Sequence, residues 1–218
     1  MLSFLAFAFF ISFSYPYPLK IVDTEGSVFF KKESKASWVK SQKSIILDKK
    51  AELRTERASV CTVSLDDKLD NVLTIKENSQ IYIENIKPVA IYIVKGRTFA
   101  LIDDITTIGA FEIHTQRARL KVRGTGESVD VSDKEVIVKC FEDNVYLNAI
   151  DEKSNITGER TIAEGFGIKI DIDGVLGDIF ELSEYDFAEW DEFTNDIGHI
   201  RANKDSSEDR QFLTRTLQ

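Results

Sequence analysis

The sequence has few of the residues from which catalytic and metal sites are usually built. Its 218 residues include two histidines, His114 and His199, and two cysteines, Cys61 and Cys140. Neither histidine has a His-x-x-x-His or Cys-x-x-Cys partner, so the sequence predicts no metal site. No nucleophile, acid and base are clustered along the chain either. We therefore expect a protein that is not an enzyme and uses no cofactor.

The chain also has fewer basic than acidic residues. The chain has 28 Lys and Arg residues against 37 Asp and Glu residues, giving a net charge of -9 and an isoelectric point near 4.9. This is the wrong sign for binding a phosphate backbone, so nucleic acid is not an expected partner. The excess of acidic residues is confined to part of the chain. Residues 171–218 hold thirteen acids and four bases, whereas residues 20–60 hold ten bases and six acids.

Only one stretch of the chain is strongly apolar, and it is too short to cross a bilayer reliably. Residues 2–13 supply about a dozen apolar positions where a membrane span needs about 20. Ser12 and Ser14 offer a cleavage site of small residues. Residues 1–14 therefore predict a secretory signal peptide, with an uncleaved membrane anchor or a buried N-terminal helix as the alternatives. After cleavage near Ser14 we expect a soluble, extracytoplasmic protein, either periplasmic or secreted.

Helical periodicity is missing from most of the chain. Between about residues 45 and 172, short runs alternate apolar and polar positions and are rich in β-branched or aromatic residues, as in residues 71–75 and 80–84. This pattern predicts an all-β domain over residues 20–175, a sandwich or short solenoid of about a dozen short strands, with a barrel as a further possibility. Parallel α/β folds are excluded because they need helices between their strands.

The two cysteines lie within such runs. Cys61 shares its parity with Val63, and Cys140 shares its parity with Val138, so both sulfurs are expected on the core side of their strands. In an oxidising compartment a Cys61–Cys140 disulfide is possible. Two buried free thiols are the equally consistent alternative.

One helix is predicted after the strands, over residues 183–198. Ser183 and Asp186 form a capping box, and Phe187, Trp190 and Phe193 continue an apolar stripe at helical spacing. The stripe is interpreted as docking on the β domain as a fixed lid, because an exposed one would be an aggregation hazard. The alternative is a partner-facing helix that uses the same three aromatic residues. Residues 202–218 are polar and are expected to form a frayed tail.

A short motif adds a family resemblance. Val122, Arg123, Gly124 and Thr125 follow a strand that ends in Thr115, and this arrangement resembles the core of the FecR family. The turn at Gly96 and the pair Asn78-Ser79 are similar to further features of the family, and the resemblance covers about residues 26–170. In physical terms the motif predicts a tight structural turn in which Arg123 satisfies buried carbonyls. A phosphate-cradling loop is disfavoured because no helix follows the turn.

The resemblance also bears on function. Well-known FecR members are transmembrane regulators that carry a signal from an outer-membrane receptor to a cytoplasmic sigma factor. The chain begins with a signal-like segment, so this route is not expected here, and other relatives are exported proteins. We expect an exported, non-enzymatic binding or interaction module of the bacterial cell envelope that recognises an envelope protein or polysaccharide. The alternative is an extracytoplasmic sensor or signal-transduction component acting through a protein partner.

Overall fold

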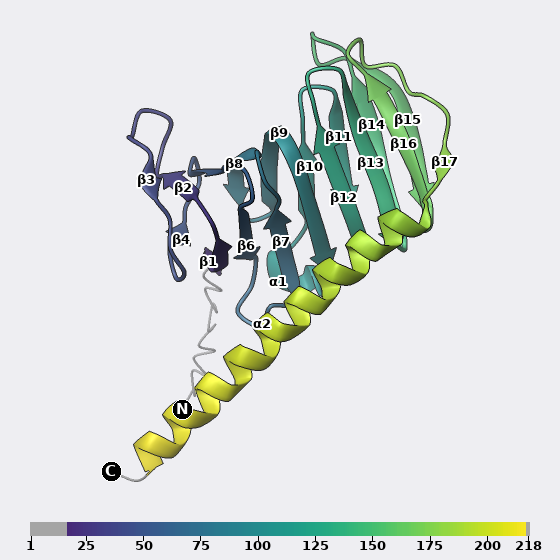
Figure 1. Cartoon of the computed structure of the whole chain (residues 1–218). Helices are drawn as coiled ribbons and strands as arrows, with labels where there is room; N and C mark the ends of the chain where they lie inside the picture. The colour runs from purple at the N-terminus through teal and green to yellow at the C-terminus, as the bar shows by residue number, and fades with distance from the viewer. Residues whose placement is uncertain (1–16, 217–218) are drawn as a thin grey trace, which may run out of the picture.

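A computed structural model describes the backbone of residues 17–216 and the side chains of residues 17–204 (Figure 1). The predicted signal peptide, residues 1–14, lies outside the described residues. The described part contains seventeen strands and two helices. In chain order they are β1 (Leu19–Glu25), β2 (Val28–Lys31), β3 (Val39–Lys40), β4 (Ile46–Leu47), β5 (Glu52–Thr55), β6 (Val60–Ser64), β7 (Asn71–Ile75), β8 (Gln80–Ile86), β9 (Val89–Ile102), α1 (Ile105–Ile108), β10 (Phe111–His114), β11 (Ala118–Val122), β12 (Gly126–Val131), β13 (Glu135–Glu142), β14 (Asn144–Ile150), β15 (Ile156–Ala163), β16 (Phe166–Asp171), β17 (Phe180–Glu181) and α2 (Glu184–Thr216).

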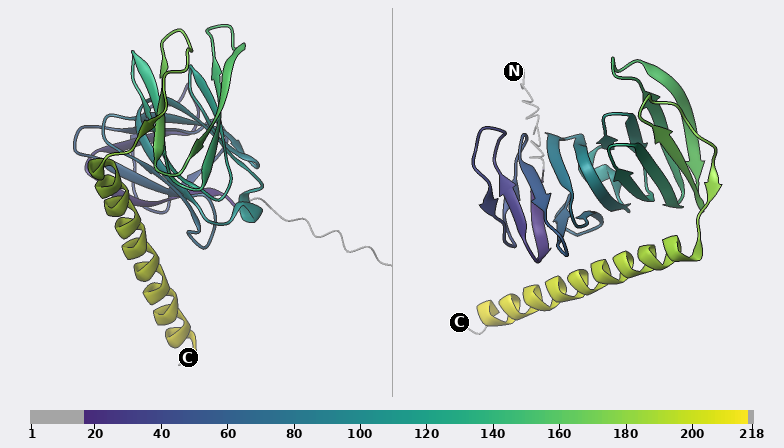
Figure 2. Two further views of the ribbon diagram at one scale, coloured as in Figure 1. Left: turned by 90° about the vertical axis from the view of Figure 1, so that its right-hand side faces the viewer. Right: turned by 45° about the horizontal axis from the view of Figure 1, so that its top comes forward.

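All seventeen strands are connected by pairing, and the long strand β9 joins two layers (Figure 2). The second half of β9 pairs with β7 and β12 in a layer that we call sheet A, ordered β4-β1-β6-β7-β9-β12-β13-β16-β17. Its first half pairs with β8 and β10 in sheet B, ordered β3-β2-β5-β8-β9-β10-β11-β14-β15. Neighbouring strands are antiparallel except β9 and β10. The predicted mostly-β architecture is confirmed, with more strands than the dozen expected.

The main core lies between the two sheets. Alternation along each strand points one set of apolar side chains inward, among them Leu73 and Val129 from sheet A and Ile91 and Leu120 from sheet B. All four are essentially inaccessible to solvent. The period-two pattern of the sequence is therefore the pattern of a two-layer β structure with one filled interior.

Gly96 makes the change of sheet within β9 possible. Its φ of +88° lies in a region that side-chain-bearing residues rarely adopt. A Cβ at this position would lie 2.5 Å from Cα of Ser79, which is fully buried. The Ser79 hydroxyl oxygen accepts a hydrogen bond from the backbone N–H of Arg97 at 3.0 Å. The glycine turn and the Asn78-Ser79 pair noted in the sequence thus pack directly against each other.

Helix α2 begins as predicted and is longer than predicted. Ser183 and Asp186 form the expected capping box: the backbone N–H of Ser183 donates to Asp186 Oδ2 at 2.8 Å, and the backbone N–H of Asp186 donates to the Ser183 hydroxyl oxygen at 3.3 Å. The helix continues through Gly198 to Thr216, so most of the segment assigned to a polar tail is helical. One exposed glycine costs only about 1 kcal/mol, and no proline follows it to stop the helix. Among the described residues, neither helix is long and apolar enough to cross a membrane.

The two cysteines are free and buried. Cys61 lies on β6 and Cys140 on β13, with β7, β9 and β12 between them in sheet A. Four strand spacings amount to about 19 Å, far beyond the reach of a disulfide. Burial raises the pKa of each thiol to about 12. Of the two alternatives, the structure shows the free thiols.

Candidate functional site

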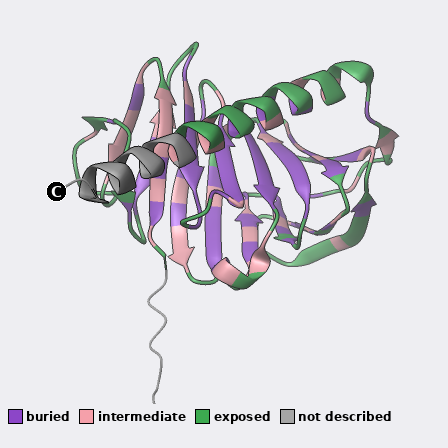
Figure 3. Cartoon of the chain, turned by 90° about the horizontal axis from the view of Figure 1, so that it is seen from below, coloured by how far each residue is buried: buried purple, intermediate pink, exposed green. Residues whose placement is uncertain are grey.

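The feature that stands out on the surface is α2, which crosses the outer face of sheet A (Figure 3). It covers a second group of apolar side chains that shares no residue with the main core. We call this group the helix–sheet cluster. Its buried members are Leu69, Val72, Phe99, Leu101 and Phe141 from the β domain, and Leu182, Trp190, Phe193 and Ile197 from the segment containing α2.

Stacked aromatic rings form the centre of the helix–sheet cluster. The ring of Trp190 lies parallel to that of Phe141, with centroids 4.7 Å apart, and Phe193 stacks on Phe99 at 5.5 Å. Gly126 provides the space for the indole, because a Cβ there would lie 2.3 Å from the Trp190 ring. Strand β12, which follows the Val122–Thr125 motif, therefore begins with Gly126, the residue against which Trp190 of α2 packs.

Charged groups flank the aromatic rings. Lys139 Nζ lies 2.5 Å from Asp186 Oδ1, and Arg97 contacts Glu189 at 3.0 Å. Arg201 donates to the backbone carbonyl of Leu69 at 2.6 Å. Partial burial works against ionisation of Asp186, but the hydrogen bonds from Lys139 and Ser183 outweigh it and lower the pKa of this carboxyl. Near its N-terminus the helix thus places carboxylates on two basic side chains of the sheet, whereas farther along Arg201 of the helix pairs with Asp103.

The three aromatic residues of the predicted helix are placed differently from one another. Trp190 is 6% exposed and Phe193 is 1% exposed, and both face sheet A. Phe187 is 38% exposed and contacts Phe141 only with its ring edge, at a centroid distance of 6.0 Å. The arrangement is therefore that of a helix docked on its own domain, with Phe187 at the margin and open to solvent.

The Val122–Thr125 motif carries the chain from sheet B to sheet A. Val122 ends β11 in the main core, Gly124 has a φ of +59°, and the buried Thr125 hydroxyl donates to Glu127 Oε2 at 2.9 Å. Arg123 is exposed and donates no hydrogen bond within the described part of the chain. The expectation that Arg123 satisfies buried carbonyls is therefore wrong. The turn depends on Gly124 and Thr125 instead.

Glu127 is a buried group that the sequence analysis did not single out. It shares its parity on β12 with Val129 and is fully buried, and its Oε1 has no hydrogen-bond partner among the described residues. Burial raises the pKa of this carboxyl well above its usual range, although the hydrogen bond from Thr125 acts in the opposite direction. The sequence did contain an indication of this buried carboxyl, because Glu127 is an acidic residue at a position that alternation assigns to the core.

Glu127 makes a testable contribution to stability. Above the pKa of an unfolded glutamate, the unfolded chain releases a proton that the folded chain retains, so this carboxyl makes stability fall as pH rises. We expect Glu127→Gln to remove that contribution and to raise the melting temperature relative to wild type by an amount that grows from about pH 5 to about pH 8. The exposed carboxyl variant Glu159→Gln is the control. A constant difference across this range, measured by calorimetry, would contradict the assignment.

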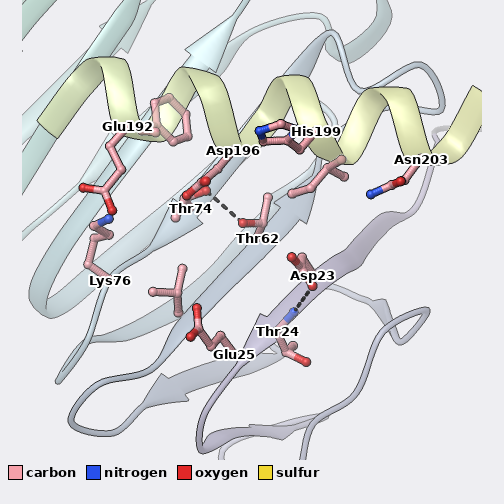
Figure 4. Close-up of a pocket in the computed structure, with 13 residues that line it drawn as sticks. Asp23, Thr24, Glu25, Thr62, Thr74, Lys76, Glu192, Asp196, His199 and Asn203 are labelled. Atoms are coloured by element: carbon pink, nitrogen blue, oxygen red, sulfur yellow. Dashed lines mark hydrogen bonds between the residues drawn. The ribbon is translucent and has the colours of Figure 1, made fainter. Parts of the chain in front are cut away.

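A cleft of about 250 Å³ opens where α2 passes over strands β1, β6 and β7 (Figure 4). Its walls carry Glu25 from the sheet, and Glu192, Asp196 and His199 from the helix. No group of three or more side chains with metal-binding geometry occurs within residues 17–204. The cleft brings together sheet residues 23–76 and helix residues 192–203, which are more than 110 positions apart, so no local sequence pattern indicated it.

Comparisons with known proteins bear on the β domain. Residues 51–146, from the turn before β5 into β14, match the family model described as FecR protein, which confirms the resemblance seen in the sequence. FecR is a non-enzymatic family, and the match bears out the expectation that residues 51–146 are not an enzyme domain. No curated protein matches the chain.

Similar solved structures are more distant. Two crystal structures from Parabacteroides distasonis ATCC 8503, each described as a "putative anti-sigma factor", are 16% and 17% identical to this chain, with TM-scores of 0.47. Each alignment covers 61% of this chain and 59% of the other. The chain thus spans about 59% of the length of the structures that it matches.

Proposed function

We propose that this protein, whose residues 51–146 are a FecR domain, is an extracytoplasmic signalling component that acts by binding a protein partner. The FecR match is the observation that carries the proposal, because FecR domains are typically extracytoplasmic and non-enzymatic. The match favours this function over that of a passive binding module for envelope polysaccharide.

The way in which α2 is held supports the proposal. A signalling component needs two states with different contacts to its partner. Helix α2 packs on a cluster that is separate from the main core, and its flanking ion pairs, Lys139 with Asp186 and Arg97 with Glu189, are partly buried at the edge of that cluster. The aromatic contacts that hold α2 therefore lie on the outer face of sheet A and not between the two sheets. The helix is therefore an element that can change its contacts without opening the β domain.

A photo-cross-linking experiment tests the proposal. A photoreactive phenylalanine analogue replaces Phe187, which is exposed at the margin of the helix–sheet cluster, in the protein produced in its native bacterium. We expect one discrete protein adduct that is absent when the analogue replaces Tyr146, which is 51% exposed on β14 in sheet B.

The same experiment has an outcome that contradicts the proposal. If no adduct forms at Phe187 and the purified protein sediments with isolated cell-wall sacculi, the protein is a polysaccharide-binding module. Sedimentation is measured with wild-type protein and with the exposed variant Phe187→Ala, so that the contribution of the helix margin is known.

A further inference from the structure

We propose that the face of sheet A beneath α2 is itself the partner-binding surface, and that α2 occupies it as an intramolecular competitor. The partner that this surface fits is an amphipathic helix with aromatic residues on one side and carboxylates beside them. This inference rests on the proposed function and specifies where, and in what form, the protein partner is recognised.

The chemistry of the face defines the partner. Phe99 and Phe141 present flat apolar surfaces, and both are almost fully buried and in ring contact with Phe193 and Trp190 of α2. Lys139 and Arg97 lie beside these rings and receive carboxylates from the helix. Gly126 leaves a recess that accepts an indole. Helix-in-groove recognition uses this combination of aromatic anchors and flanking charges, and α2 shows which helix the face accepts.

The contact between α2 and the sheet can open by itself. No strand of either sheet pairs with α2, and the main core contains none of its side chains. Two hollows lie along α2, and Lys76 lines both of them. One is the 250 Å³ cleft described above, and the other, of about 410 Å³, lies beside Arg97, Tyr185 and Glu189. A helix that contributes nothing to the main core is expected to open at a lower free energy than the strands beneath it.

Competition has a measurable consequence. A ligand that needs the open state binds with an apparent affinity reduced by the fraction of molecules that are open. A change that weakens the docking of α2 must therefore tighten binding of an external helix to the same face. A change that damages the face must weaken both contacts.

The probe is a synthetic, fluorescently labelled peptide with the sequence of residues 183–204, added to the full-length protein. We expect Trp190→Ala in the protein to tighten peptide binding about 10-fold or more relative to wild type. Asp191→Ala, at an exposed position on the same helix, should leave binding unchanged. Glu189→Gln removes an ion pair without leaving a cavity and should tighten binding to a smaller extent. Equal binding to all four proteins, measured by fluorescence anisotropy, would overturn the proposal.

A charge exchange tests whether the peptide takes the place of α2. In the Trp190→Ala protein, Lys139→Glu should weaken binding of the wild-type peptide because it places two carboxylates together. A peptide carrying Asp186→Lys should recover the lost affinity on that protein. Failure to recover would show that the peptide binds elsewhere and would overturn the proposal.

Hydrogen exchange on the wild-type protein gives evidence that does not depend on substitutions. We expect the amides of residues 187–201 to exchange through an opening that leaves β9 and β12 protected. If helix and strands exchange only together, α2 is a fixed lid and the proposal is wrong. Because the peptide is this chain's own sequence, these results and the cross-linking of a native partner can fail independently.

Discussion

Replacing Gly96 by alanine is expected to destabilise the protein by about 3 kcal/mol or more. Two costs add at this position. An alanine at a φ of +88° is strained, and its Cβ would lie 2.5 Å from a backbone atom of Ser79, which has no free space into which to move. Urea unfolding monitored by circular dichroism measures the loss.

Gly165 supplies the matched control for this prediction. Its φ of +82° is nearly the same, but a Cβ there would meet nothing within 4 Å. Gly165→Ala should therefore cost only the conformational strain, about 1 to 2 kcal/mol. If the two variants lose the same stability, the contact with Ser79 is not what requires glycine in β9.

Replacing Trp190 by alanine is expected to remove about 3 to 5 kcal/mol from the docking of α2. The indole is buried, stacks on Phe141 and fills the space above Gly126, so its loss leaves a large void. The loss should appear first as reduced hydrogen-exchange protection of α2, because the helix–sheet cluster is separate from the main core.

Phe187 on the same helix is the control for Trp190. Because Phe187 is largely open to solvent, Phe187→Ala should cost less than about 1 kcal/mol and leave the protection of α2 almost unchanged. Similar losses in the two variants would show that the stacked rings do not hold the helix.

The sequence predicted local features of the fold better than it predicted their assembly. The period-two alternation and the capping box at Ser183 both follow from short-range steric and hydrogen-bonding rules, and both are present. Strands β3, β4 and β17 have two residues each, too few to show any period. The sharing of β9 between two sheets depends on pairings between distant segments, which alternation does not encode.

For the candidate site, too, the sequence predicted local features and did not predict how distant segments meet. The stripe that contains Trp190 and Phe193 was visible in the sequence, and burial against the domain was the favoured interpretation. The acidic cleft and the recess at Gly126 were not visible, because each forms only when α2 meets strands made much earlier in the chain. Arg123 was misassigned because a donor-rich side chain beside a turn was assumed to point inward.

The position of β9 also determines the order in which the chain can fold during synthesis. Strands β7 and β8 both emerge before β9, and each needs β9 as its partner on one side. Until that single strand appears, the two nascent layers each present an unpaired edge next to apolar side chains. Such edges are where incomplete chains associate with one another. A chain that ends before β9 therefore exposes the free edges of two separate strands, β7 and β8, whereas a chain that includes β9 connects them through one strand.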